Sequence, residues 1–353
     1  MSWSRAVLVF GLGMLLCSGA FAMFRVANMV VVPTAASTPG LYGSNWHTDL
    51  EIMNVDSVAI DVQIVLLKCC GVDNVTWFQD IKNSLGGRSD EGFGKVEPKL
   101  ADIQPGQTVY LNDVVQFGWG DSVKGSLLVF AYEAGTLMKT TPPGGNPKLI
   151  LVNSRTYSLG TDASNNPLTF GTQVPGMPWY NYIDPAQKTR GLDHAQFTGL
   201  TENAAYRTAV GLVNVSDRLT MLNAQLTLNA SDGTQITSTF VQLLPLAMDQ
   251  YDQAIIALFG KTAADNITGA TLRVAIASYV TGALNPAPAL MAYVTRMDNA
   301  TNDPVYIEQA FTVELPWDCV FNGNCAASAT GLALGATRGT QSHLRPPVPR
   351  LVK

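Results

Sequence analysis

Residues 46–56 read WHTDLEIMNVD and residues 206–216 read YRTAVGLVNVS, so one motif occurs twice, 160 residues apart. Each copy has an aromatic residue, a threonine two positions later, alternating aliphatic residues and an Asn-Val pair. Self-similarity at a constant offset is the signature of a repeated structural unit. A chain of 353 residues is long enough for two domains of moderate size. We therefore predict two tandem copies of one fold unit.

A second alternating run follows each copy of the motif. Aliphatic residues occupy every second position of 58–66 and of 222–228, with polar residues such as Asp61, Gln63 and Asn223 between them. This period predicts strands that have one face in a core and the other in water. Asp232-Gly233, between two such runs, predicts a tight hairpin. Short strands with frequent turn signals favour antiparallel β-sandwiches.

Each copy also contains one short helical piece. Apolar residues recur with helical spacing over 252–259, and Gly260 follows where a helix commonly ends. An equivalent stretch in the first copy ends at Phe117-Gly118. Residues 149–156 and 290–297 match as a further strand in each copy. The predicted class is all-β, with two tandem antiparallel sandwiches.

Several of these strings resemble a recurrent unit of secreted bacterial proteins whose functions are largely uncharacterised. The strings are residues 31–33, 46–54, 171–175, 199–208, 211–216 and 303–307. The resemblance implies immunoglobulin-like sandwiches in tandem and transfers no catalytic residue. It places the second copy's start near Phe170, because Val174-Pro175 takes the part of Val32-Pro33. The implied domains are 23–168 and 169–312.

Two segments have no counterpart in the other copy. Residues 69–101 are rich in Gly, Asp, Asn and Lys and are predicted to be a long surface loop inserted in the first domain. Ordinary loop divergence is the favoured explanation, and a specific contact in this loop is the alternative. Residues 313–353 lose the alternating pattern and end in a Pro-rich stretch, which favours a mobile tail.

The N-terminal segment predicts export. Residues 1–22 combine Arg5, an apolar run at 6–17 and the small-residue site Ala20-Phe21-Ala22, which is typical of a signal peptide cleaved after Ala22. An uncleaved anchor is the alternative, but this run is shorter than the ~20 residues that cross a bilayer. A lipid anchor is disfavoured by Leu16 before Cys17. We expect a secreted, periplasmic or cell-surface protein with no membrane span after cleavage.

Cleavage would leave four cysteines in an oxidising compartment, where three pairings are open. Cys319 and Cys325 bracket a short loop and are predicted to form a local disulfide. Cys69 and Cys70 are adjacent, and adjacent cysteines pair only with strain. We interpret all four as structural, with the connectivity open.

Composition excludes several functions. A net charge of -5 and the lack of any Lys/Arg cluster argue against nucleic acid as a partner. The three histidines, His47, His194 and His343, lie too far apart for a zinc motif, so neither a metal nor a cofactor is expected. Neither a Gly-x-Ser-x-Gly motif nor a Gly-rich phosphate loop occurs. We predict that the protein is not an enzyme.

One aromatic cluster suggests a binding site. Trp179, Tyr180 and Tyr182 lie in a Pro-bounded loop, where flat rings could hold a sugar or a peptide. The alternative is that these rings cover the junction between the domains. The favoured function is an exported structural or interaction protein, with another envelope protein or a polysaccharide as partner and an open oligomeric state. A carbohydrate-binding module is the alternative, and a hydrolase with an unrecognised carboxylate site is a third.

Overall fold

The computed structural model describes residues 25–136, 145–161, 165, 167–284 and 286–311. The predicted signal segment 1–22, Cys319, Cys325, His343 and the tail 313–353 lie outside these residues. The described chain is mostly β-strand, and every strand pair within it is antiparallel except the short pair β4–β5. The all-β prediction is confirmed.

The first half forms one sheet that bends sharply where β1 passes into β2 and folds onto itself. Its order is β5-β4-β3-β7-β1-β2-β8-β9, with β6 beside β2 and β10 beside β1. Leu50 and Ile52 from one arm pack against Ile64, Leu66 and Val129 from the other. The elements are β1 (Met29–Pro39), β2 (Asn45–Asn54), β3 (Ile60–Lys68), α2 (Asn74–Gln79), β4 (Ser84–Gly86), β5 (Lys95–Val96), β6 (Thr108–Leu111), α3 (Val114–Trp119), β7 (Val123–Glu133), β8 (Ile150–Thr161), β9 (Pro167–Pro175) and β10 (Met177–Pro178).

The second half consists of two sheets packed face to face. One has the order β14-β13-β16-β11-β19 and the other the order β15-β12-β17-β18. Leu226 and Val274 of the first pack with Leu212 and Val294 of the second. The elements are β11 (His194–Glu202), β12 (Tyr206–Asn214), β13 (Thr220–Asn229), β14 (Gln235–Leu243), β15 (Met248–Tyr251), α4 (Ala254–Phe259), β16 (Ile267–Thr281), β17 (Leu290–Asp298), β18 (Pro304–Glu308) and β19 (Ala310–Phe311).

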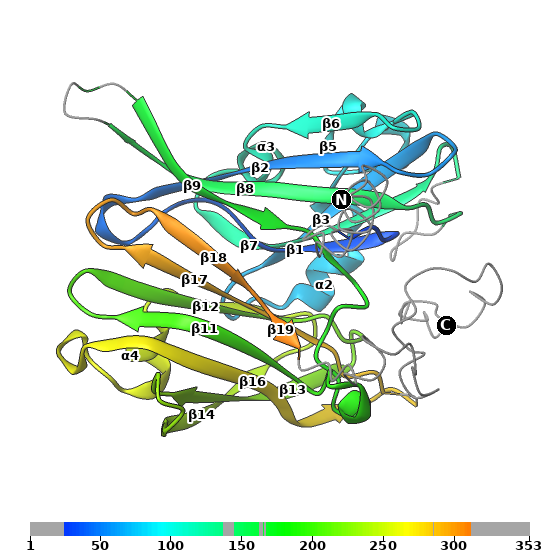
Figure 1. Ribbon diagram of the computed structural model, residues 1–353. Helices are drawn as coiled ribbons and strands as arrows, with labels where there is room; N and C mark the ends of the chain where they lie inside the picture. Colours follow the sequence, from blue (N-terminus) through cyan, green and yellow to red (C-terminus); the bar gives the residue numbers. More distant parts are fainter. Residues whose placement is uncertain (1–24, 137–144, 162–164, 166, 285, 312–353) are drawn as a thin grey trace, which may run out of the picture.

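The two halves stack as four layers (Figure 1). The outer sheets are β6-β2-β8-β9 and β14-β13-β16-β11-β19, and the middle sheets are β5-β4-β3-β7-β1 and β15-β12-β17-β18. A third apolar cluster, which we call the junction layer, fills the space between the middle sheets. It joins Val31, Val65, Leu67, Leu128 and Phe130 of the first half to Val213, Leu246, Met248, Met291 and Tyr293 of the second.

The repeated motif makes the same contacts in both halves. The Oγ1 atoms of Thr48 and Thr208 each accept a backbone N–H from the preceding strand, at 2.8 and 3.0 Å. Asn54 and Asn214 are both fully buried, and the Nδ2 atom of each donates to two backbone carbonyls. The acceptors are Val58 and Ile103 in one half, and Thr220 and Leu244 in the other.

The hairpin and helix predictions for the second half are confirmed. Gly233 lies in the β13–β14 turn with a φ of +86°, a conformation that favours glycine. Gly260 follows α4 with a φ of +64° and caps it through its backbone N–H.

The prediction that one face of the strand is exposed to water is confirmed for β13 but is wrong for β3. Alternate residues of β13 are buried and partly exposed. In β3 the polar Asp61 and Gln63 are 0% and 1% exposed, as buried as the aliphatic residues between them. The reason is that β3 lies in a middle sheet, which is covered on both faces.

The segment 69–101 folds as a cover rather than as a plain loop. It contains α2, β4 and β5, and β4 pairs with β3. Arg88 from this segment forms an ion pair with Asp61 at 3.2 Å, and the Oγ atom of Ser84 accepts from Gln63 Nε2 at 3.0 Å. The insertion therefore buries the polar end of β3.

The expected start of the second copy near Phe170 falls inside β9. This strand pairs with β8 along its whole length, from Asn153↔Pro175 to Thr161↔Pro167, so residues 167–175 belong to the first half's sheet. The strand of the second half that takes the place of β1 is β11. It pairs with β19, as β1 pairs with β10.

Candidate functional site

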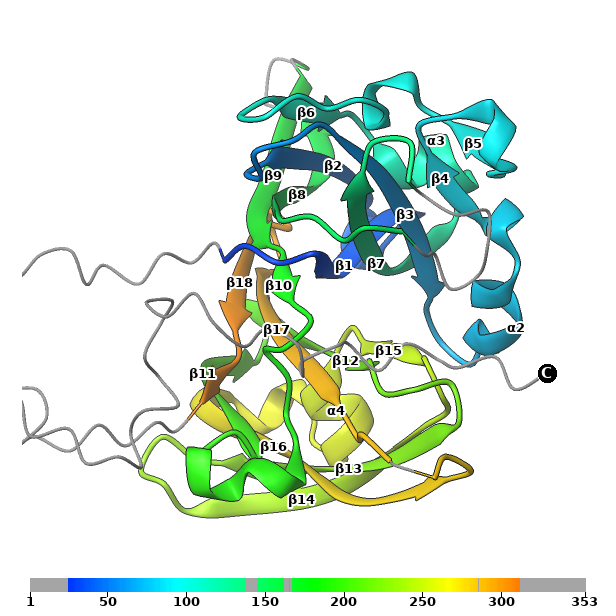
Figure 2. The same ribbon diagram turned by 90° about the vertical axis from the view of Figure 1, so that its right-hand side faces the viewer.

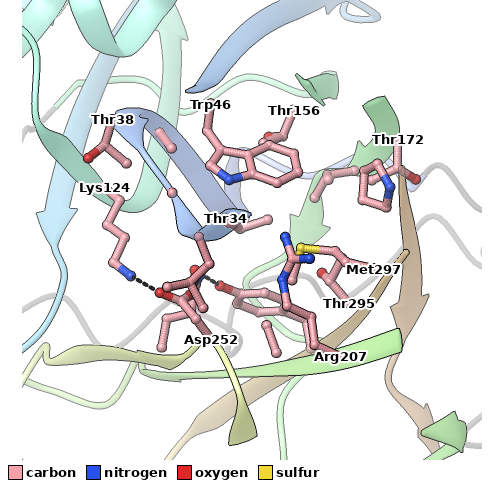
Figure 3. A pocket seen from close by; sticks show the side chains of 18 of the residues that line it. Thr34, Thr38, Trp46, Lys124, Thr156, Thr172, Arg207, Asp252, Thr295 and Met297 are labelled. Atoms are coloured by element: carbon pink, nitrogen blue, oxygen red, sulfur yellow. Dashed lines mark hydrogen bonds and ion pairs between the residues drawn. The ribbon is translucent and has the colours of Figure 1, made fainter. Parts of the chain in front are cut away.

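A cleft of about 70 Å³ opens at one end of the junction layer (Figure 3). Both halves line it. Its lining includes Thr34, Trp46 and Lys124 from the first half, and Arg207, Gln250, Asp252, Tyr293, Thr295, Met297 and Pro304 from the second. The site therefore exists only where the two halves meet.

The cleft arises because the face of β12 and β17 that points to the first half is apolar at one end and polar at the other. Val213 and Met291 lie in the junction layer, whereas Arg207 and Thr295 line the cleft. Gly211 allows the change between them, because a Cβ atom there would lie 1.9 Å from the Tyr293 ring. The Tyr293 ring thus occupies the space above Gly211 and separates the apolar part of the junction from the polar part.

Arg207 is the most unusual side chain of the cleft. It is 1% exposed, yet its charged group contacts only neutral partners: Nη1 donates to Asn299 Oδ1 at 3.0 Å, and Nη2 to Asn302 Oδ1 at 2.7 Å. The guanidinium lies 4.9 Å from the centre of the Tyr42 ring. Its Nε atom is buried without a partner, and no carboxylate of the described residues forms an ion pair with it. Burial lowers the pKa of Arg207 from its ordinary value.

The other walls combine an ion pair, an aromatic ring and a buried phenol. Lys124 Nζ lies 3.1 Å from Asp252 Oδ2, which joins the two halves at the rim. The Tyr293 hydroxyl donates to Gln250 Oε1 at 2.7 Å. Figure 3 shows the Trp46 indole on the upper side of the cleft and the Arg207 side chain reaching toward it from the lower side.

The adjacent cysteines lie close to this site. Cys69 and Cys70 form a disulfide at the end of β3. The Cys70 backbone N–H donates to the Met248 carbonyl at 2.8 Å, which attaches this turn to β15. Burial raises the pKa of Asp249, the next residue of β15.

The three predicted aromatic residues lie outside the cleft and are not equivalent. Trp179 packs against the core of the first half, and its indole N–H donates to Asn28 Oδ1 at 3.1 Å. Tyr182 packs against the junction layer. Tyr180 alone presents much of its ring to solvent, at 47% exposure.

The described histidines form separate pairs with aspartates. His47 Nδ1 lies 2.7 Å from Asp113 Oδ2 on the first outer sheet, and His194 Nδ1 lies 3.1 Å from Asp193 Oδ1. Asp49, beside His47, accepts the Tyr110 hydroxyl at 2.8 Å and the Asp113 backbone N–H at 2.9 Å. Within the described ranges, no group of three or more His, Cys, Asp or Glu side chains is arranged to hold a metal ion.

Comparison with protein-family models, with curated proteins and with solved structures finds no match to this chain. Among the helices that the structure describes, none has the length and apolar character required to cross a bilayer.

The cleft was not predicted from the sequence, although three of its lining residues, Trp46, Arg207 and Ala209, belong to the repeated motif. Trp46 and Arg207 were interpreted only as strand residues. The available signal was the charge of Arg207 in a strand whose next six residues carry no charge. Lys124 and Asp252 give no such signal, because an isolated charge near a strand end is ordinary.

Proposed function

We propose that this chain is an exported, non-enzymatic structural or interaction protein, built from two tandem immunoglobulin-like sandwiches fused into one rigid body. The observation that carries the proposal is the junction layer. A largely apolar interface between domains suppresses their relative motion, whereas polar interfaces permit it. A rigid body holds the loops of both halves at fixed distances, as a spacer or scaffold requires.

The tandem character is supported by matched hydrogen bonds and by matched strand order. Thr48 and Thr208, like Asn54 and Asn214, make equivalent contacts. Strands β1 to β10 of the first half have counterparts among β11 to β19 of the second. In the second half the chain passes from one sheet to the other after β11, β12, β14, β15, β16 and β18. Such switching is typical of Greek-key sandwiches, the class to which immunoglobulin-like domains belong.

An oxidising location is supported by two features that are far apart in the sequence. Residues 1–22 have the pattern of a signal peptide. Residues Cys69 and Cys70 form a disulfide, and disulfides persist in oxidising compartments outside the cytosol.

The proposal is tested on the untagged protein in its own host, by cell fractionation followed by size-exclusion chromatography with light scattering. We expect recovery in the envelope or extracellular fraction, in particles heavier than one chain. Recovery in the cytosol would contradict export. Turnover of chromogenic glycosides or esters by the purified protein would contradict the non-enzymatic role.

The carbohydrate-binding alternative is tested separately at the aromatic loop. Because Trp179 packs against a core, Trp179→Ala should lower stability by about 2 kcal/mol. Tyr180→Ala, at the exposed ring, should leave stability within about 0.5 kcal/mol. Titration of both variants against a polysaccharide panel decides the matter, since a sugar site here requires binding by the wild type that Tyr180→Ala weakens.

A further inference from the structure

We propose that the cleft between the two halves binds a carboxylate group of a small hydroxylated acid, such as a sugar acid, with Arg207 Nε–H and the Trp46 indole N–H as donors. This site is independent of the proposed structural role, because it rests on the groups that line the cleft and not on the rigidity of the body.

The charge of Arg207 favours an anionic ligand. A cation taken out of water is costly unless an opposite charge compensates it. Arg207 is buried among neutral oxygens and the Tyr42 ring. The charges of Asp252, Glu202 and Asp298 act on it, but no described carboxylate approaches closely enough to form an ion pair with it. Asp252, a nearby wall residue, is engaged by Lys124. A bound carboxylate would place a negative charge in direct contact with the guanidinium.

Two N–H donors beside the cleft lack acceptors. Arg207 Nε is buried without a partner, and it lies along the planar edge with which a guanidinium binds carboxylates. The Trp46 indole N–H also has no hydrogen-bond acceptor among the residues that the structure describes, and Trp46 lines the same cleft. Indole and guanidinium N–H groups only donate. Two unpaired donors of this kind favour an anion over a cation or a neutral apolar group.

The remaining wall of the cleft suits hydroxyl groups beside an apolar surface. Thr34 and Thr295 contribute hydroxyls, and Met297 and Pro304 contribute apolar surface. Flat aromatic faces such as that of Trp46 are suited to the apolar side of a sugar ring. The volume of about 70 Å³ limits the buried part of the ligand to a group of a few atoms, so the rest must lie in the mouth.

The test uses the full chain with the Trp indole nitrogens labelled with ¹⁵N. Galacturonate is the probe, and galactose is the matched neutral control. We expect saturable shifts of the Trp46 indole resonance with galacturonate, with a dissociation constant of the order of 1 mM, and no saturation with galactose. Acetate should compete with galacturonate, which would identify the carboxylate as the recognised group.

Two variants report on the donors. Trp46→Phe keeps an aromatic ring and removes the N–H, and it should weaken galacturonate binding about tenfold, measured by calorimetry. Trp119→Phe is the matched control, because the Trp119 indole donates elsewhere, to the Asn83 carbonyl at 2.9 Å, and binding should not change. Arg207→Lys keeps the charge without the planar edge and should abolish binding in protein that retains its melting temperature.

Equal responses to galacturonate and galactose would overturn the carboxylate assignment. Binding that Trp46→Phe leaves unchanged, or a Trp46 resonance that does not shift in about 100 mM galacturonate, roughly a hundred times the expected dissociation constant, would overturn the site itself. The Trp46→Phe result remains decisive if Arg207→Lys does not fold.

Discussion

The two middle sheets and the two outer sheets are built from similar strands but bury them differently. β13, in an outer sheet, alternates between buried and partly exposed residues, whereas β3, β7 and β12 are buried almost throughout. Figure 2 shows the arrangement of the layers. The middle strands face an outer sheet on one side, and on the other side they are covered by the opposite half or, at one end of β3, by the segment 69–101. Alternation in a sequence therefore reports which side chains share a face, and says nothing about whether that face meets water.

The junction-side face of β3 illustrates how a polar face becomes buried. Val65 and Leu67 at one end lie in the junction layer, while Asp61 and Gln63 at the other end are covered by Arg88 and β4. The second half therefore covers one end of this face of β3, and the insertion 69–101 covers the other end.

The largest effect is expected for a charge placed in the junction layer. Val213→Asp buries a carboxylate without a counter-ion and should cost at least about 4 kcal/mol of unfolding free energy. Val280→Asp, at a position that is 67% exposed on an outer sheet, should change it by less than about 0.5 kcal/mol. Chemical denaturation measures both. Equal costs would mean that the middle and outer sheets do not differ as described.

Asp61 is expected to show the next largest effect. Asp61→Ala removes the acceptor of Arg88 and of the Asp102 and Gly135 backbone N–H groups, and it should cost about 3 kcal/mol. Asn223→Ala on β13, whose single hydrogen bond is 3.5 Å long and exposed, should cost under about 0.5 kcal/mol. A small effect of Asp61→Ala would show that the insertion does not exclude water from this face of β3 in solution.

Glu202 lies at the end of β11, at the margin of an outer sheet, and is nevertheless buried. Burial raises its pKa from about 4.5 to about 7, although Thr208 N–H and the charge of Arg207 act in the opposite direction. Because the folded state holds this proton more tightly than the unfolded chain, stability should fall by about 2 kcal/mol as the pH rises from about 4.5 to 7.

Glu202→Gln should remove this pH dependence, because the amide does not titrate. Thermal melts of both proteins at several pH values measure the difference. Parallel curves for the wild type and Glu202→Gln would show that the carboxyl titrates normally.

The smallest effect is expected for the ion pair that joins the halves at the cleft rim. Lys124 and Asp252 are both partly exposed, so Lys124→Met should cost less than about 1 kcal/mol, with a difference from wild type that shrinks at high salt. A loss as large as that of Val213→Asp would mean that charge, rather than the apolar junction layer, holds the halves together.

Local features of the fold were predictable from the sequence, because they depend on neighbouring residues. Asp232-Gly233 marked the β13–β14 hairpin, Gly260 marked the end of α4, and the 160-residue offset matched Asn54 to Asn214. The boundary near Phe170 was misplaced because Val174-Pro175 ends β9, so a Val-Pro pair does not identify a first strand.

The stacking of the halves and the cleft were not predictable, because both depend on residues distant in the sequence. Asp61 is spaced like an exposed residue, and its burial is compensated by partners distant in the sequence, namely Arg88 and the backbone N–H groups of Asp102 and Gly135. The cleft places Trp46 and Arg207, 161 residues apart, on opposite sides of a space that neither half forms alone.

The junction layer has a consequence for the order in which the chain is made. Synthesis proceeds from the N-terminus, so the face with Val31, Val65 and Leu128 emerges before β12 and β17, which cover it. Until residues 206–298 follow, the first half exposes a contiguous apolar surface of the kind that promotes aggregation. The nascent chain is therefore prone to aggregation until its second half has been made. A chaperone that binds apolar surface should raise the yield of folded protein most when synthesis of the second half is slow.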